Sequence, residues 1–184
     1  MTILWKRLDH PGHEWCRLHR EKGLWTLGGV AVFAFNDLAC MLRYEIRCDA
    51  SWATRSATIS GTAGRKEVFV RITADRHGHW RLNGKTRAAV QGCIDVDLGF
   101  SPSTNLLPIR RLGLAVGKEA RVRAAWVEFP SLKLKPLDQV YRRTGERAMR
   151  YESAGGAFVR DLTVDSDGFV TDCPGLWKAE TPGG

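Results

Sequence analysis

The chain has 184 residues and a formal net charge of +8, with 43% of its residues hydrophobic and 26% charged. This composition is typical of a globular protein and argues against a disordered chain, and the length fits one domain over residues 1–184. The longest apolar run, residues 30–35, is far shorter than the roughly 18 residues of a membrane helix. The positive charge favours anionic partners such as nucleic acid, phosphorylated molecules or anionic lipid.

Residues 1–15 and the cysteines bear on the cellular compartment. Lys6 and Arg7 come early, and no apolar segment typical of a secretory signal follows them. The cysteines at positions 16, 40, 48, 93 and 173 are odd in number and include no C-x-x-C pair, which argues against a disulfide framework and a structural zinc site. We therefore expect a reduced, cytoplasmic protein.

Hydrophobic and polar residues alternate in four segments. Every second side chain between Cys40 and Cys48 is apolar, and residues 66–75, 120–129 and 158–164 repeat the pattern. Because successive side chains of a strand point to opposite faces, the alternation predicts half-buried strands. Turn signals at residues 76–79, at Asn83-Gly84 and at residues 165–168 separate such runs. Short strands about ten residues apart predict a sandwich, roll or barrel.

Helical signals are few. Residues 33–40 are expected to form a loop-to-helix step, and residues 137–144, after Pro136, either a short helix or a strand. Residues 100–108 contain several turn-forming residues and are expected to form a loop between strands.

The segment 93–112 concentrates polar groups that could form a site. Asp95 and Asp97 share one face of an expected strand, and Arg110 and Arg111 follow the loop. On a strand these two arginines would face opposite ways, so one is expected to pair with an aspartate and the other to remain free for an anionic ligand. A purely structural Asp–Arg pair that locks the loop fits the sequence equally well.

No metal or cofactor is expected. His10 and His13 flank one turn and His77 and His79 another, but no carboxylate or cysteine at ligand spacing completes either set. No glycine-rich phosphate-binding motif occurs either.

Several motifs resemble those of the bacterial putative glycolipid-binding protein family. The specific run is TNLLPIRRL at residues 104–112, after Asp95-x-Asp97. Residues 80–84, 124–130 and 164–177, together with Gln139-x-Tyr141 and Arg150-Tyr151, also resemble the family, so the resemblance covers roughly residues 14–178. It implies an all-β fold with little helix: a strongly curved antiparallel roll or half-open barrel, similar to periplasmic lipoprotein carriers.

The resemblance and the aromatic content together predict non-catalytic binding of a glycolipid or other amphiphile on the concave face of the roll. Trp and Tyr line apolar pockets while offering a polar group. The expected ligand-binding residues are Asn105, Arg110, Arg111, Trp80, Trp126, Tyr141 and Tyr151. Asp95 and Asp97 are expected to serve as structural partners of the arginines.

Two other functions remain open at this point. A small-molecule hydrolase or isomerase could use Asp95 or Asp97 as a base and Arg110 or Arg111 to stabilise an oxyanion. Nucleic-acid binding would require a contiguous basic and aromatic face; we expect no nucleic-acid partner, because many arginines have acidic neighbours. The oligomeric state is not determined by the sequence.

Overall fold

The computed structural model describes residues 1–181, which form one long sheet. Its strands are β1 Thr2–Arg7, β2 Gly12–Glu21, β3 Leu24–Phe35, β4 Leu38–Cys48, β5 Thr54–Ala63, β6 Lys66–Ala74, β7 Trp80–Leu82, β8 Lys85–Thr86, β9 Val96–Leu98, β10 Glu119–Glu128, β11 Lys133–Arg143, β12 Ala148–Ser153, β13 Phe158–Val164, β14 Val170–Cys173 and β15 Trp177–Thr181. The helical segments are η1 Ala88–Val90, η2 Ser103–Asn105, α1 Leu106–Leu112 and η3 Ala154–Gly156.

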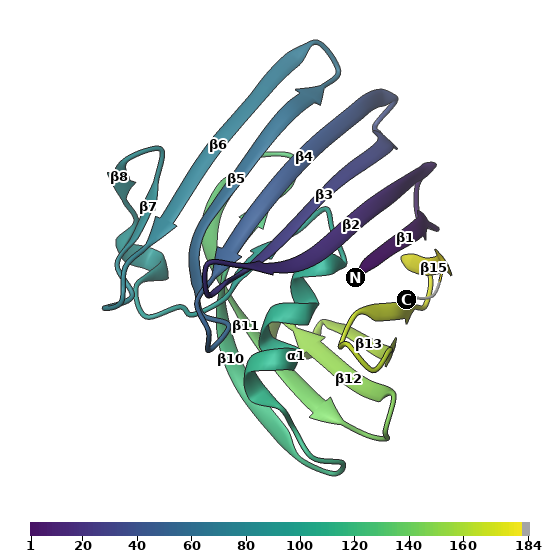
Figure 1. The fold of residues 1–184 in the computed structure, drawn as a ribbon. Coiled ribbons are helices and arrows are strands. Elements are labelled where there is room, and N and C mark those ends of the chain that lie inside the picture. Colours follow the sequence, from purple (N-terminus) through teal and green to yellow (C-terminus); the bar gives the residue numbers. More distant parts are fainter. Residues whose placement is uncertain (182–184) are drawn as a thin grey trace.

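The strand order makes a curved sheet that does not close. Consecutive strands pair antiparallel from β1 to β8 and from β10 to β15, and β1 pairs with β15, so the two ends of the chain meet in the middle of the sheet. The two edges are β8 and β9, and β9 pairs parallel with β10. Figure 1 shows strands β1–β6 curling over one side of α1 and β10–β13 over the other. The predicted single-domain, strongly curved roll with little helix is confirmed.

Alternation of apolar and polar residues identified the strands correctly. Residues 40–49, 66–75, 120–129 and 158–164 correspond to β4, β6, β10 and β13, with ends that differ by one or two residues. Residues 137–144, left open between helix and strand, lie almost entirely in β11. Apolar residues therefore recur at every second position in these strands, because one face of the sheet is buried and the other is exposed.

Two predictions of local structure were wrong. Residues 33–40 form a tight hairpin between β3 and β4, because Asn36 and Asp37 both take positive φ, a conformation that these residue types tolerate. Residues 106–112 form the helix α1 and not a loop and strand. Pro108 lies in the first turn of α1, where its missing N–H costs no helical hydrogen bond. Gly113 ends the helix in the left-handed conformation, with φ of 51°.

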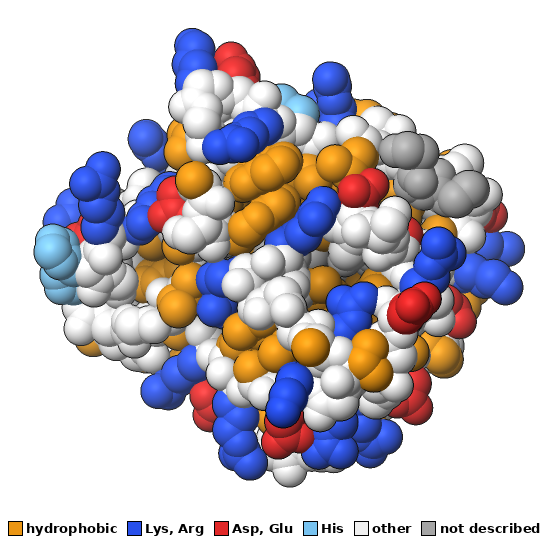
Figure 2. Space-filling model, turned by 60° about the horizontal axis from the view of Figure 1, so that its bottom comes forward, with side chains coloured by type: hydrophobic (Ala, Val, Ile, Leu, Met, Phe, Trp, Pro, Cys, Tyr) orange, Lys and Arg blue, Asp and Glu red, His pale blue; other side chains and the backbone are white. Residues whose placement is uncertain are grey.

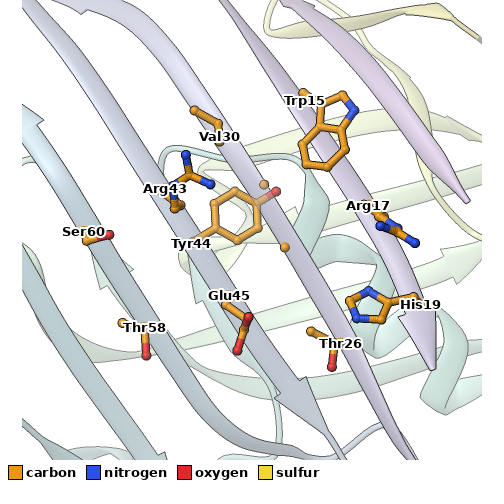
Figure 3. A pocket seen from close by; sticks show the side chains of 12 residues that line it. Trp15, Arg17, His19, Thr26, Val30, Arg43, Tyr44, Glu45, Thr58 and Ser60 are labelled. Carbon is orange, nitrogen blue, oxygen red and sulfur yellow. The ribbon is translucent and has the colours of Figure 1, made fainter. Parts of the chain in front are cut away.

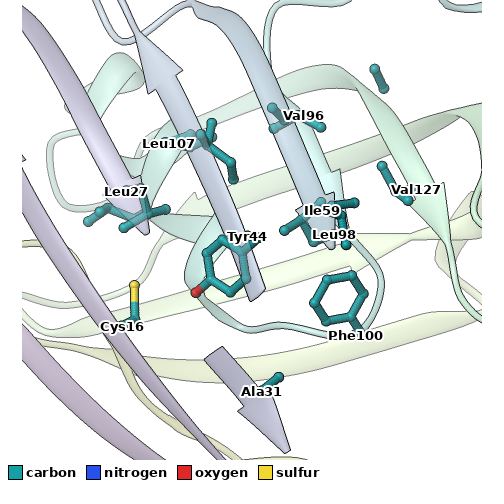
Figure 4. Close-up of a cluster of buried hydrophobic side chains, with 14 of the residues drawn as sticks. Cys16, Leu27, Ala31, Tyr44, Ile59, Val96, Leu98, Phe100, Leu107 and Val127 are labelled. Atoms are coloured by element: carbon teal, nitrogen blue, oxygen red, sulfur yellow. The ribbon is translucent and has the colours of Figure 1, made fainter. Parts of the chain in front are cut away.

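The segment 96–112 fills much of the concave face of the sheet. Leu98, Leu106 and Leu107 are 0% exposed. Figure 4 shows Leu98, Phe100 and Leu107 among buried side chains of β2–β5 and β10. Burying one such side chain contributes roughly 1.5–3 kcal/mol to stability. The interior of the roll is therefore mainly a packed core, and only part of the concave face remains free.

A glycine in β3, Gly29, leaves room for the buried side chain of Tyr44 to cross this strand. A Cβ atom on Gly29 would lie 2.4 Å from Tyr44 Oη and 2.7 Å from the backbone oxygen of Trp15. Gly28 faces the other side of the sheet, where it leaves a hollow of about 230 Å³. Figure 3 shows this hollow, with the Tyr44 ring seen between Trp15 and Arg43. Gly29 is thus required by close packing, whereas Gly28 is not.

We expect Gly29→Ala to lower the free energy of unfolding by about 1–3 kcal/mol, because the added methyl group overpacks the core. Gly28→Ala is the matched control, since its Cβ would meet only Tyr44 O at 3.6 Å. This control should be neutral or slightly stabilising. Urea denaturation of the two variants measures the difference, and equal destabilisation by both would contradict the assignment.

Candidate functional site

An inner cavity of about 450 Å³ remains between the segment 97–105 and the concave face of strands β10–β15. Its lining comprises Arg7, Asp9, Asp97, Leu98, Gly99, Ser101, Pro102, Asn105, Trp126, Leu137, Tyr151, Ser153, Ala154, Phe158, Leu162, Cys173, Leu176 and Trp177. Among these, Asp9, Gly99 and Ala154 are exposed, so the cavity opens to solvent beside the β1–β2 turn and η3. Its volume is within the range of about 300–1,000 Å³ typical of small-molecule sites.

Most of the lining is apolar. Strand alternation brings Leu137, Tyr151 and Leu162 to the concave face from three neighbouring strands. Trp126 contributes to the lining from β10. Trp177 contributes from β15, which lies at the opposite end of the run of strands from β10 to β15. These side chains form walls that could cover an apolar ligand, with the indole rings adding large rigid surfaces.

Arg7 and Asp9 form the charged part of the lining. Arg7 Nε and Nη2 donate to the two carboxylate oxygens of Asp9 at 2.7 and 3.0 Å. Partial burial acts to raise the pKa of Asp9, but the hydrogen bonds and charge of Arg7 hold it below its usual value. The pair therefore stays ionised at neutral pH.

Asp97 is the second carboxylate of the lining. Gln139 Nε2 donates to Asp97 Oδ2 at 2.5 Å and lies 3.0 Å from Tyr151 Oη. Burial raises the pKa of Asp97 to about 6, although hydrogen bonds from Gln139 and Thr104 lower it. Asp97 is thus partnered by an amide and not by an arginine, and its carboxyl group titrates closer to neutral pH than an ordinary aspartate.

Asn105 and Tyr141 are joined beside the cavity. Tyr141 Oη donates to Asn105 Oδ1 at 2.8 Å, and Asn105 Nδ2 donates to the carbonyl of Pro102 at 3.1 Å. These bonds fix the loop before α1 against β11. Asn105 lines the cavity, whereas Tyr141 supports it from behind.

A buried polar cluster formed by Glu14, Tyr44, Ser101 and Ser103 lies behind the cavity. Tyr44 Oη and Ser101 Oγ each donate to Glu14 Oε1 at 2.6 Å, while Glu14 Oε2 has no partner. Ser101 also lies 2.7 Å from Ser103 Oγ and lines the cavity. Burial raises the pKa of Glu14 to about 7, against the lowering effects of Ser101, Tyr44 and Arg7. Glu14 thus links β2, β4 and the loop before α1 through one carboxyl group.

Three residues expected at the ligand lie away from the inner cavity. Arg111 donates to both oxygens of the buried Asp95, at 3.0 and 2.5 Å. Arg110 pairs with Asp167 at 3.3 Å, and its guanidinium carbon lies 5.5 Å from a Trp52 ring centroid. Trp80 is 0% exposed and donates to the carbonyl of Cys93. Asn105, Trp126 and Tyr151 therefore line the cavity and Tyr141 lies behind Asn105, whereas Arg110, Arg111 and Trp80 lie elsewhere.

Sequence reasoning missed the charged residues of β1 and β2. In β1, Arg7 has the same spacing as the inward-facing Ile3 and Trp5. In β2, Glu14 has the same spacing as the inward-facing Cys16 and Leu18. Both residues could have been identified from the sequence, because each is a charged residue at a position where the alternation of the strand calls for an apolar one.

The molecular surface carries mixed charge. On the face shown in Figure 2, Lys and Arg side chains are dispersed, with Asp, Glu and hydrophobic side chains between them. On the outer side of β2–β6, Glu45 lies in the hollow of Figure 3 and accepts a hydrogen bond from Arg47 at 2.9 Å. Within residues 1–181 no three His, Cys, Asp or Glu side chains are grouped as metal ligands, and no helix has the length and apolar character to cross a membrane.

Comparison with known proteins identifies the family. The model of a family described as putative glycolipid-binding matches residues 2–179. The fold is similar to the crystal structure of a DUF1089 family protein from Pseudomonas aeruginosa, with a TM-score of 0.77 and 35% sequence identity over 90% of this chain and 91% of that one. No curated protein gives a significant match. The chain belongs to the putative glycolipid-binding family.

The buried carboxyl group of Glu14 predicts a pH-dependent stability. The folded chain retains a proton up to about pH 7 that the unfolded chain releases near 4.5, so the free energy of unfolding falls as pH rises between these values. From pH 6 to pH 8 the loss attributable to Glu14 is about 1 kcal/mol.

Glu14→Gln should remove this loss, because it replaces the titrating group with a neutral one of the same shape. Urea denaturation at pH 6 and pH 8 compares the variant with the wild type, and Glu45→Gln on the outer face is the control. Equal pH dependence in Glu14→Gln and the wild type would show that Glu14 does not titrate in this range.

Proposed function

We propose that this member of the putative glycolipid-binding family holds one amphipathic molecule in the inner cavity. The apolar tail would lie against the walls formed by Trp126, Leu137, Leu162 and Trp177. The polar head would lie near the mouth, beside Arg7 and Asp9. The single observation that carries the proposal is that one cavity of about 450 Å³ combines these apolar walls with charged and amide groups in its lining.

The distribution of polar groups supports this orientation. Asp9 is exposed at the mouth, and Arg7 is tied to it. Leu162 and Trp177 are buried, and Phe158 is half-buried. An amphiphile gains from such a division, because the tail leaves water while the head keeps hydrogen-bonding partners.

The proposal places the head group at Arg7 and not at Arg110 or Arg111. Arg111 already satisfies the buried Asp95, and displacing it would leave that carboxylate without its partner. Arg110 is engaged with Asp167 and Trp52 on another side of the molecule.

The size of the cavity sets the size of the ligand. A volume near 450 Å³ matches a small-molecule ligand or a head group with one short tail. Longer or multiple acyl chains would extend through the mouth. Tail length should therefore increase affinity only until the cavity is filled.

Titration calorimetry with hexyl, octyl and decyl β-D-glucoside, each below its micelle concentration, tests the proposal. Each buried CH₂ contributes about 0.8 kcal/mol, which is nearly a fourfold tightening per carbon while the tail remains inside. An affinity that does not change with tail length would contradict binding of the tail in the cavity.

Variants locate the site. Leu176→Trp adds a bulky ring to the lining and should weaken binding of octyl glucoside about tenfold or more by removing cavity volume. Phe69→Trp adds a comparable ring on the exposed outer face, where Phe69 is 68% exposed, and should bind like the wild type. Native mass spectrometry of protein purified from its own host, with extraction of any adduct, would then identify the natural ligand class.

A further inference from the structure

Large hydrophobic side chains are exposed together on the outer face of strands β2–β6. Of the nine that are exposed within residues 1–181, four lie there: Trp15 at 44%, Val32 at 54%, Met41 at 40% and Phe69 at 68%. The strand register places Val32 directly opposite Met41, and Trp15 opposite the half-buried Val30. Grouped apolar side chains on a surface indicate an interaction site, whereas single scattered ones do not.

One row of this surface runs straight across the sheet. Trp15, Val30, Arg43, Ser60 and Phe69 are successive register partners from β2 to β6. Figure 3 shows Trp15, Val30, Arg43 and Ser60 on their four strands. Neighbouring strands are about 4.8 Å apart, so the row spans about 19 Å. We call this surface the outer patch: Trp15, Val30, Val32, Met41, Arg43 and Phe69.

The outer patch carries a surplus of positive charge. Three exposed arginines in or beside it make no ion pair within residues 1–181: Arg17, Arg43 and Arg71. The register rows on either side hold two carboxylates, Glu45 and Glu67. Glu45 is compensated by Arg47, which donates to it at 2.9 Å. The arginines therefore outnumber the carboxylates, which favours an anionic partner.

A lipid bilayer with anionic head groups matches both properties of the outer patch. Indole and phenyl rings and aliphatic side chains can enter the boundary between head groups and acyl chains, while arginines pair with the phosphates above it. A single-stranded nucleic acid fits less well, because its successive bases need neighbouring aromatic rings. Trp15 and Phe69 lie at opposite ends of the row, about 19 Å apart, with Val30, Arg43 and Ser60 between them.

We propose that the outer patch docks this protein on the surface of an anionic phospholipid bilayer. Trp15 and Phe69 enter the interfacial layer, and Arg17, Arg43 and Arg71 contact lipid phosphates. This activity goes beyond the binding of a ligand in the inner cavity and does not depend on it. The outer patch lies on the outer face of β2–β6, whereas the inner cavity lies on the concave face of β10–β15.

The first test is co-sedimentation of the full chain with large vesicles. Vesicles of phosphatidylcholine alone are compared with vesicles that also contain about one third phosphatidylglycerol. Each arginine near an anionic surface contributes about fivefold to affinity, so the anionic vesicles should bind at least about tenfold more tightly. Raising sodium chloride from about 0.1 M to about 0.5 M should weaken this binding, because salt screens exposed charges.

Charge variants locate the docking face. The double variant Arg17→Gln/Arg43→Gln should bind anionic vesicles about twentyfold more weakly than the wild type. Arg121→Gln/Arg147→Gln is the matched control. It removes the same charge from two exposed arginines, one in β10 and one in the connection between β11 and β12. This control should change binding by no more than about threefold, because its arginines lie far from the outer patch in the sheet.

A fluorescent label reports directly which side of the molecule meets the bilayer. All five native cysteines are buried, so an added exposed cysteine can be labelled selectively with a polarity-sensitive dye. In Phe69→Cys the dye emission should rise about twofold or more and shift to the blue on addition of anionic vesicles, since position 69 enters the interface. Val116→Cys is the control, because Val116 is 56% exposed but lies in the loop between α1 and β10. Its label should not respond.

Leu176→Trp, which fills part of the inner cavity, should bind vesicles like the wild type. Loss of vesicle binding in this variant would show that the cavity, and not the outer patch, takes up lipid. Equal binding to neutral and anionic vesicles, or equal loss in the two arginine double variants, would also overturn the proposal. So would a response of the label at position 116 without one at position 69. Failure to bind any vesicle, with binding of a single-stranded oligonucleotide that needs Arg17 and Arg43, would assign the outer patch to nucleic acid instead.

Discussion

Burial of the segment 96–112 against the concave face of the sheet is the interaction on which the rest of the structure depends. The fifteen-stranded sheet has two free edges, and within residues 1–181 no second sheet covers its apolar inner surface. Leu98, Leu106 and Leu107, all fully buried, supply the opposing surface. Without them the roll would expose its core to water on one side, because a sheet must pack its apolar face against another layer.

The polar groups buried behind this segment give it a defined position. Hydrophobic packing is non-directional, but the hydrogen bonds of Ser101 and Tyr44 to Glu14 have fixed geometry. The bidentate pair of Arg111 with Asp95 fixes the other end of the segment. A buried carboxyl group lowers the stability of the fold when it ionises. These contacts therefore fix the position of the segment at a cost in the free energy of folding.

The inner cavity is the space that this arrangement leaves unfilled. The segment 96–112 packs tightly against β2–β5 and β10, as Figure 4 shows, but less completely against β11–β15. Indole and aliphatic side chains line this cavity, and the ion pair between Arg7 and Asp9 lies at its border. Arg7, Asp9 and Asn105 each have a protein partner that holds the side chain in place.

The sequence alone determined the strands, since burial of one face of a sheet forces an alternation that can be read directly in segments such as residues 40–49. The run 104–112 and its flanking motifs also pointed to the family and hence to the curved roll. Sequence reasoning placed Asn105, Trp126, Tyr141 and Tyr151 near a ligand, but it treated residues 106–112 as a loop and strand. It therefore assigned Arg110 and Arg111 to opposite faces of one element. Only the tertiary structure decided that the helix α1 enters the roll, that Arg7 and Asp9 border the cavity, and that Glu14 lies behind it. These depend on contacts between residues far apart in the chain, such as β1 with β15 and β2 with the loop before α1. A local pattern shows which side of a strand faces inward, but not which distant segment it will meet there.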